Sequence, residues 1–173
     1  MYNFERITKE RLSHLVILYK AAFNKKISID FLAKKFDTER LGTGYLGFLA
    51  YDENNEPAAY YGVFPYLVRN GNMNIVTAQS GDTMTHPKHQ GKGLFTTLAK
   101  MTYELAKNEG IDLVWGFPNK NSYPGFIKKL NWMDNEVLIK SKIKIRTLPV
   151  AKALNKIKIQ WFDALYALSL IHI

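Results

Sequence analysis

The chain has 173 residues, a net charge of +9 and 47% apolar residues, a balance that suits one globular domain and excludes a disordered chain. It contains no cysteine, which excludes disulfides, thiolate catalysis and the usual zinc sites, and we expect no metal. The segment 1–7 is short and mixes apolar with charged residues, so we expect no secretory signal and a cytoplasmic protein.

The first half of the chain is predicted to begin with helices and to continue as a meander of strands. The strongest signal is Asn70-Gly71, because this pair favours a tight two-residue hairpin between two strands. Apolar residues at helical or alternating spacing define the other elements. The expected elements are a strand at 3–7, helices at 10–23 and 28–36, and strands at 45–51, 58–69 and 73–85.

The second half is predicted to alternate helices with strands. Apolar residues recur at helical spacing after Gly93, and Gly110 supplies a C-terminal stop. A strand, a crossover helix and a second strand imply a parallel pair within an otherwise antiparallel sheet. The expected elements are a helix at 93–108, a strand at 111–116, a short helix around 126–130 and a strand at 132–146.

The segment Gln90-Gly91-Lys92-Gly93-Leu94-Phe95 is a basic loop, interrupted by glycines, that opens a helix. Small residues let backbone amides approach an anion, and the first turn of a helix leaves unpaired N–H groups with partial positive charge. Lys92 adds a full positive charge. The loop therefore favours binding of a pyrophosphate, although glycine and lysine also mark ordinary surface turns.

Two familiar phosphate-binding motifs do not fit this loop. A P-loop requires a glycine where His86 stands and a serine or threonine where Gly93 stands. A dinucleotide fingerprint requires a third glycine where Thr96 stands. Its acidic residue should also end the next strand, whereas Asp112 lies at the start of one. The P-loop is therefore excluded, and the dinucleotide motif is a weak match.

Three features follow one another in an order that matches a known family. Gln90 and Gly93 fit a signature of Arg or Gln, two residues, Gly, one residue, then Gly or Ala, although Phe95 holds its last position. The run 83–87 before the loop is a strand that ends in a proline, and the run 117–119 ends the next strand with an asparagine. From Asp82 to Trp132 the sequence thus resembles the GNAT acetyltransferases, which move an acyl group from coenzyme A to an amine.

The resemblance implies an α/β fold of the α+β kind: a mixed, mostly antiparallel sheet flanked by helices, whose one parallel pair splays to admit the cofactor. It also implies an enzyme, an N-acetyltransferase in which an amine attacks acetyl-CoA directly in a ternary complex. A small-molecule amine or amino sugar is the expected acceptor; an aminoglycoside-like compound, a protein N-terminus and a lysine stay open. The implied cofactor-binding residues are Thr83, Met84, Thr85, Gln90, Gly91, Lys92, Gly93, Leu94, Phe95 and Asn119.

Such chemistry needs a neutral amine and a proton for the leaving thiolate. Asp82 is the candidate base, because it lies on the strand that resembles the cofactor-binding strand; its alternative role is to face solvent or to pair with a lysine. His86 is a second candidate base, but a loop position beside Pro87 is an equally simple reading.

The proton donor is harder to assign. In the family pattern of Asn, two residues, Ala or Ser, three residues, Tyr, both Asn119 and Ser122 match, but Phe126 holds the tyrosine position. Counting back from Asn131-Trp132 instead gives Ile127, which cannot donate a proton either. Tyr123 is the nearest phenol that could substitute, with packing as its alternative role.

Aromatic residues on the central strands allow two interpretations. They line an acceptor cleft between the two N-terminal helices and the strand after Trp132, or they form the core of the sheet. The residues concerned are Tyr60, Tyr61, Phe64, Tyr66 and Trp115.

The second half of the chain carries most of the positive charge, with 14 basic and 6 acidic residues in 86–173. Many of these lysines alternate with apolar residues, which favours solvated faces over a nucleic-acid or lipid surface, and no nucleic-acid partner is expected.

We expect an acetyltransferase domain at 1–146 and an extension at 147–173. The apolar run 157–173 is too short and too charged for a membrane span. It packs on the domain, pairs with another subunit in a homodimer, or begins a further domain. Residues 169–173 resemble adapter read-through, so the completeness of the chain stays open.

Two other classes of function remain. The substitution of the family tyrosine and the unusual C-terminal segment are compatible with a non-catalytic acyl-CoA-binding module that regulates or assembles. A basic surface protein for nucleic acid or membranes would not need the glycine loop at all.

Overall fold

A computed structural model of the chain describes residues 1–134. Residues 135–173 lie outside the described part. They hold most of the strand expected at 132–146, the expected domain boundary at 146, the extension 147–173 and many of the lysines that alternate with apolar residues. In residues 1–134, every helix is too short or too polar to cross a membrane.

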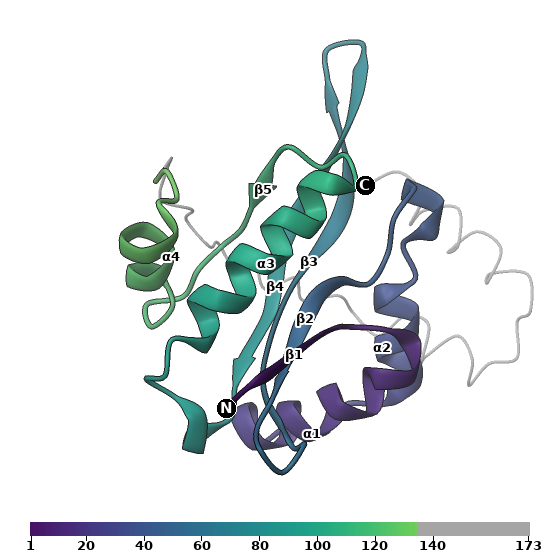
Figure 1. Cartoon of the computed structure of the whole chain (residues 1–173). Coiled ribbons are helices and arrows are strands. Elements are labelled where there is room, and N and C mark those ends of the chain that lie inside the picture. Colours follow the sequence, from purple (N-terminus) through teal and green to yellow (C-terminus); the bar gives the residue numbers. More distant parts are fainter. Residues whose placement is uncertain (135–173) are drawn as a thin grey trace, which may run out of the picture. The chain divides into compact units, whose positions relative to one another are not determined.

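The described part of the chain contains strands, α-helices and short 3-10 turns (Figure 1). The 3-10 turns are η1 (Lys9–Arg11), η2 (Glu39–Leu41) and η3 (Pro87–His89). The strands and α-helices are β1 (Asn3–Arg6), α1 (Leu12–Phe23), α2 (Ile29–Phe36), β2 (Leu46–Tyr51), β3 (Pro57–Asn70), β4 (Met73–Thr85), α3 (Leu94–Asn108), β5 (Val114–Trp115) and α4 (Tyr123–Leu130).

The strands form one mixed sheet in the order β1-β2-β3-β4-β5. The first four strands pair with one another in antiparallel fashion, and β5 runs parallel to β4 after the crossover through α3. Gly71 turns the β3–β4 hairpin with a φ of +59°, a backbone conformation that glycine adopts freely. The predicted fold class, with a mostly antiparallel sheet, one parallel pair and flanking helices, is confirmed.

The sheet is covered by helices on both faces. Successive side chains of a strand point to opposite faces. Tyr60 accordingly packs with the buried residues of α1 and α2, whereas its neighbour Tyr61 packs with those of α3 and α4. Figure 1 shows α3 crossing one face of the sheet, with α4 beside the β5 edge. The core is thus split by the sheet into two apolar layers.

The structure differs from the predicted elements by more than one residue in the first helix, the fourth helix and the last strand. The first helix begins with the turn η1, so α1 starts at Leu12. The fourth helix starts at Tyr123, because Pro124 is tolerated in the first helical turn. The strand β5 holds only two residues, since its pairing with β4 stops at Gln79 and Trp115.

β4 contains a bulge at Asp82 that the sequence pattern did not predict. Tyr60 pairs with Met84 and Gly62 with Gly81, so two residues of β4 lie opposite Tyr61 alone. Asp82 has a φ of +54°, in the left-handed region that aspartate tolerates better than most residues. A bulge bends its strand and redirects side chains, and this one lies beside the cavity described below.

Gly62 is required by the close packing of Tyr60. A Cβ added at Gly62 would lie 2.6 Å from Tyr60 Cζ and 3.1 Å from the carbonyl oxygen of Leu46. We expect Gly62→Ala to lower the free energy of unfolding by about 3 kcal/mol, measured by urea titration. The control is Gly44→Ala, where the added Cβ approaches no atom closer than 3.4 Å. Equal stability of the two variants would contradict this reading of the core.

Candidate active site

The glycine loop and the start of α3 form an anion-binding geometry. Gly91 and Gly93 have φ values of +76° and +77°, and a Cβ added to either would meet nothing within 4 Å. Gly93 is the N-cap of α3 and leaves the helix without a side-chain cap. Among residues 1–134 the amides of Leu94 and Phe95 have no hydrogen-bond partner. Unpaired amides and the helix dipole at an open surface favour an anion.

These amides border a cavity of about 160 Å³, which we call the loop cavity. Its lining includes every residue of the predicted loop together with Thr85 from the end of β4. His89, Thr96 and Lys129 also line it, and the sequence did not indicate them. The full lining is Thr85, His89, Gln90, Gly91, Lys92, Gly93, Leu94, Phe95, Thr96 and Lys129.

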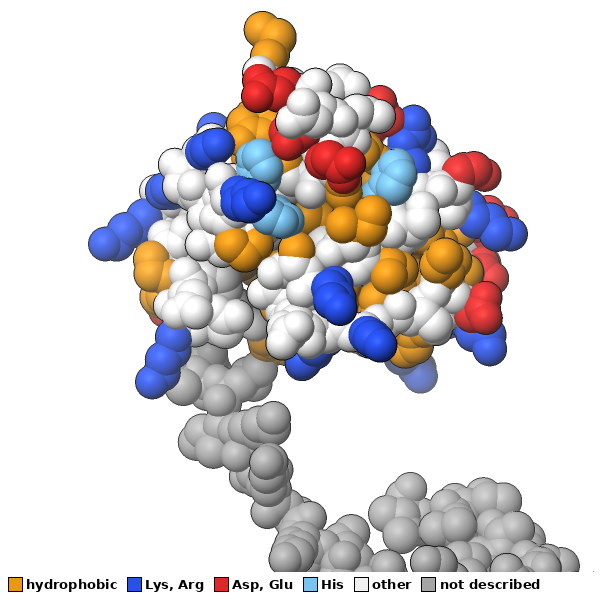
Figure 2. Space-filling model, turned by 90° about the horizontal axis from the view of Figure 1, so that it is seen from below, with side chains coloured by type: hydrophobic (Ala, Val, Ile, Leu, Met, Phe, Trp, Pro, Cys, Tyr) orange, Lys and Arg blue, Asp and Glu red, His pale blue; other side chains and the backbone are white. Residues whose placement is uncertain are grey.

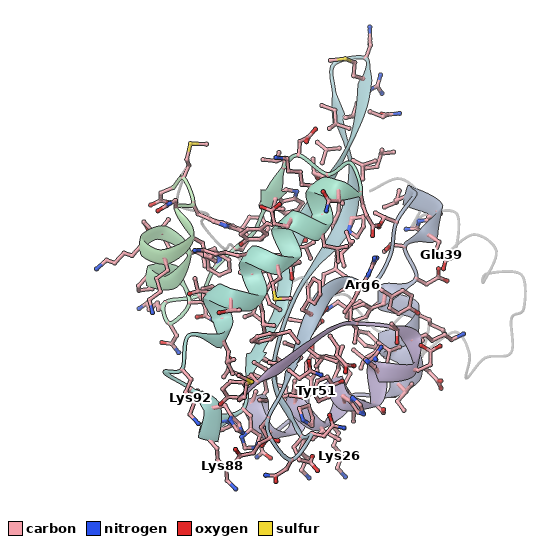
Figure 3. All side chains as sticks on the ribbon, in the orientation of Figure 1. Arg6, Lys26, Glu39, Tyr51, Lys88 and Lys92 are labelled. Atoms are coloured by element: carbon pink, nitrogen blue, oxygen red, sulfur yellow. The ribbon has the colours of Figure 1, made fainter. Side chains whose placement is uncertain are left out.

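The charge around the loop cavity is positive. Lys92 comes from the loop and Lys129 from α4, and Figure 3 shows Lys88 and Lys92 at the end of the molecule where α3 begins. Figure 2 views that end and shows side chains of the Lys and Arg colour close to histidine side chains on its surface. Burial, and then the charge of Lys92, lowers the pKa of His89, which also hydrogen bonds the hydroxyl of Tyr2 at 2.7 Å. At neutral pH the two lysines therefore carry the positive charge of the cavity.

A second cavity of about 270 Å³, the splay cavity, opens where β4 and β5 separate. The last paired residues are Gln79 and Trp115, and from Ser80 to Thr85 the β5 side of β4 has no strand partner within residues 1–134. Among the described residues, no strand competes with an extended ligand for these main-chain groups. The lining is Phe23, Ser80, Gly81, Asp82, Thr83, Gly116, Phe117, Pro118, Asn119, Ser122 and Phe126.

Asp82 reaches the splay cavity from the bulge and pairs with a lysine from α2. Lys35 Nζ lies 2.5 Å from Asp82 Oδ2 and 4.6 Å from the centre of the Phe64 ring. Asp82 is mostly buried, with 14% of its side chain exposed, and Lys35 has 31% exposed. Burial, and then the neighbouring Asp82 carboxylate, raises the pKa of Tyr19 on α1. Asp82, which lines the cavity, thus lies beside the Lys35 ammonium and near the Tyr19 phenol, and neither of these two residues lines the cavity itself.

The other predicted site residues divide between the cavities and their surroundings. Thr83 and Asn119 line the splay cavity, and Asn119 Oδ1 also accepts bonds from the amides of Asn121 and Ser122 at the start of α4. Met84 buries its side chain in the core under α1 and α2. His86 caps η3 by accepting a bond from the amide of Lys88.

Tyr123 lies on α4 with 40% of its surface exposed, outside the lining of both cavities. Its hydroxyl donates to Asp134, and this bond raises the pKa of the phenol. The two candidate catalytic residues, Asp82 and Tyr123, are therefore not brought to the same cavity wall.

The aromatic strand residues mostly belong to the core. Tyr60 and Tyr61 are fully buried, Phe64 is nearly so, and all three belong to the apolar layers. Tyr66 is half exposed and its ring lies 5.7 Å from that of Trp115. The aromatic residues that border the splay cavity instead are Phe23, Phe117 and Phe126.

A chain of side-chain hydrogen bonds runs from the splay cavity into the layer under α3. Tyr61 OH lies 2.8 Å from Ser80 Oγ and 2.7 Å from Tyr103 OH. The indole N–H of Trp132 donates to Tyr103 OH at 3.0 Å. Among the described residues in this series of hydrogen bonds, only Ser80 lines the cavity.

Comparison with known proteins agrees with this fold. The family model described as an acetyltransferase (GNAT) domain matches residues 3–133. The chain therefore belongs to the GNAT acetyltransferases, as the sequence motifs predicted. A comparison with curated protein sequences found no match.

Solved structures of acetyltransferases share the fold at low sequence identity. An acetyltransferase of Trypanosoma brucei is 17% identical, with a TM-score of 0.63 over 83% of this chain and 100% of that one. An aminoglycoside 6′-N-acetyltransferase of Acinetobacter baumannii is 16% identical, with a TM-score of 0.61 over 84% and 100%. A glucosamine-6-phosphate N-acetyltransferase of Arabidopsis thaliana is 13% identical, with a TM-score of 0.62 over 83% and 99%.

Proposed function

We propose that the protein is an N-acetyltransferase that moves the acetyl group of acetyl-CoA to an amine by direct attack in a ternary complex. The observation that carries the proposal is the pair of cavities along one edge of β4. Thr85 lines the loop cavity, and the residues from Ser80 to Thr83 line the splay cavity. A ligand with an anionic end and an extended arm would fill both.

The chain's own groups fit coenzyme A in two ways. The unpaired amides of Leu94 and Phe95, with Lys92 and Lys129, would hold its pyrophosphate. The open edge of β4 would pair with the amide groups of its pantetheine arm, which would place the thioester in the splay cavity.

Asp82 would act as the base at the acceptor end of the splay cavity. Aliphatic amines are mostly protonated at neutral pH, and an ammonium has no lone pair with which to attack a carbonyl. Asp82 would attract the ammonium and take its proton, directly or through one water. In the structure Lys35 holds this position beside the carboxylate, so the acceptor amine would compete with it.

The acceptor is proposed to be a small-molecule amine or amino sugar. The splay cavity measures about 270 Å³ and ends at a carboxylate, which favours a small cationic group. Two of the structural neighbours are an aminoglycoside and a glucosamine-6-phosphate N-acetyltransferase. Tyr123 would act as the acid only if its hydroxyl left Asp134 and turned towards the cavity.

A thiol-release screen tests the proposal. Acetyl-CoA is mixed with the protein and a panel of amines and amino sugars, and free thiol is measured beside a calorimetric titration with CoA. Because the chain has no cysteine, CoA supplies the only thiol in the sample. We expect binding of CoA and acceptor-dependent release of thiol. Absence of CoA binding would contradict the proposal.

The alternative is an acyl-CoA-binding module without turnover. Two observations favour this alternative. The Asp82 carboxylate is already paired with Lys35, and Phe126 stands at the family's tyrosine position. Such a module would bind CoA in the titration and release no thiol with any amine in the panel.

The two lysines of the loop cavity give a prediction about salt. We expect Lys92→Gln and Lys129→Gln each to weaken CoA binding about three- to tenfold at low ionic strength, and less at high ionic strength, because partly exposed charges are screened by salt. Calorimetry at two salt concentrations measures this. Lys107→Gln, at the opposite end of α3, is the matched control and should leave the affinity unchanged.

A further inference from the structure

The hydrogen-bond chain behind the splay cavity has a direction. The indole N–H of Trp132 can only donate, so the hydroxyl oxygen of Tyr103 accepts this hydrogen bond. If Tyr61 also donated to Tyr103, the hydroxyl proton of Tyr103 would have no acceptor among residues 1–134. Both tyrosine protons find an acceptor when Tyr103 donates to Tyr61 and Tyr61 donates to Ser80.

In this arrangement the hydroxyl proton of Ser80 ends the series of hydrogen bonds and faces the splay cavity. Ser80 is also the first residue of β4 beyond the last pair with β5, Gln79 and Trp115. A Cβ added at Gly116 opposite would lie 3.4 Å from Ser80 Cβ, so the two strands are still close there. The donor therefore stands at the closed end of the cavity.

The three groups behind Ser80 are held in place by packing. Tyr61 is fully buried, and its ring lies 5.7 Å from that of Phe95 and 5.8 Å from that of Tyr103. The Trp132 ring lies 4.4 Å from that of Phe126 and covers Gly116, where an added Cβ would approach it to 3.3 Å. Burial raises the pKa values of Tyr61 and Tyr103, so both hydroxyls keep their protons at neutral pH.

We propose that Ser80 donates a hydrogen bond to the sulfur of the departing thiolate, with Tyr61, Tyr103 and Trp132 as the residues that position its hydroxyl. The inference rests on the proposed function. In this step the amine nitrogen bonds to the carbonyl carbon, the C–S bond breaks, and its electron pair leaves on sulfur. The surplus proton of the amine goes to Asp82 and then to solvent. Ser80 keeps its own proton and stabilises negative charge where it develops, at a group that is already oriented.

Successive hydroxyl groups that donate to one another polarise the last O–H bond, which strengthens it as a donor. The series of hydrogen bonds from Trp132 to Ser80 thereby supplies a donor, although Phe126 and Ile127 stand at the positions where the family pattern places a tyrosine. Tyr123 cannot act through the same chain, because its hydroxyl is bonded to Asp134.

Titration of the CoA thiol tests the inference without an acceptor. The thiolate absorbs in the ultraviolet and, since the chain has no cysteine, protein without CoA is a sufficient blank. A donor to sulfur stabilises the thiolate and lowers the pKa of the bound thiol below that of free CoA. We expect the midpoint to be about one pH unit higher in Ser80→Ala than in the wild type, with Ser80→Thr close to the wild type. Equal midpoints in the wild type and Ser80→Ala would overturn the inference.

A double-mutant cycle on turnover separates positioning from packing. We expect Ser80→Ala to lower kcat about tenfold with little change in the KM for acetyl-CoA. Tyr61→Phe should lower kcat in the wild type and have no further effect in the Ser80→Ala background, because it acts through Ser80. Additive losses from Tyr61→Phe and Ser80→Ala would contradict the positioning role.

The results distinguish this inference from the proposed function. If the protein binds no CoA, both are overturned. If CoA binds and the wild type releases no thiol with any amine, the proposed function falls, and Ser80 has no departing thiolate to stabilise. If the wild type turns over and Ser80→Ala matches it in both measurements, only the inference falls.

Discussion

Gly93→Asp is expected to weaken CoA binding about 100-fold or more while the protein stays folded. The new carboxylate would stand at the N-cap of α3, where it repels an anionic ligand and competes for the unpaired amides of Leu94 and Phe95. A Cβ at this position meets no atom within 4 Å, so the substitution creates no clash. Its φ of +77° adds backbone strain of about 1–2 kcal/mol. Calorimetric titration with CoA measures the loss.

Two controls separate charge from strain. Gly93→Asn adds the same bulk without the charge and, because asparagine tolerates the left-handed region, it should lose much less affinity. Gly110→Asp introduces the same residue at a φ of +79° beyond the other end of α3, again with no atom within 4 Å. It should bind CoA like the wild type. A folded Gly93→Asp protein with unchanged affinity would remove the loop from the binding site.

Asp82→Asn is expected to lower kcat about 10²–10³-fold while CoA affinity stays nearly unchanged. General-base assistance is typically worth about 10²–10⁴-fold, and an asparagine of the same shape cannot accept the proton of the amine. The lost rate should partly return as the pH rises towards the pKa of the acceptor, near 10 for an alkyl amine, because more amine is then neutral. The pH profiles of kcat for both proteins check this.

Lys35→Met is the matched control, because it breaks the same ion pair from the other side and leaves the carboxylate in place. The variant should keep most of the turnover, because it removes only the Lys35 ammonium, which competes weakly with the acceptor amine for Asp82. If Asp82→Asn turns over at the wild-type rate across the pH range, Asp82 takes no proton. Similar losses in the two variants would mean that the ion pair matters through structure alone.

Much of the fold could be predicted because local residues determine it. Asn70-Gly71 turns the hairpin, Gly110 follows the end of α3, and alternation places Tyr60 and Tyr61 in opposite layers. The length of β5 was wrong because pairing depends on where its neighbour diverges, which no residue of 111–116 signals. The bulge at Asp82 also depends on the partner strand. Its only local signal is an aspartate after a glycine within a strand, a residue type that strands disfavour.

The candidate site was predictable where it is continuous in sequence and not where it is assembled in space. The loop from Gln90 to Phe95 lines one cavity as a unit. Lys129 and Lys35 read as ordinary charges on amphipathic helices, and only the packing of α4 and α2 brings them to the cavity and to Asp82. Ser80 belongs to no sequence motif. Its proposed role depends on the buried hydroxyls of Tyr61 and Tyr103, which are distant in sequence.

Transfer of an isotopically labelled acetyl group tests the central claim most directly. The protein is incubated with acetyl-CoA labelled in the acetyl group and with an amine that releases thiol in the screen, and the amine is analysed by mass spectrometry. We predict an acceptor heavier by one labelled acetyl group, in amounts equal to the thiol released and absent without protein. Thiol release with the label recovered only as acetate would contradict acetyl transfer to an amine.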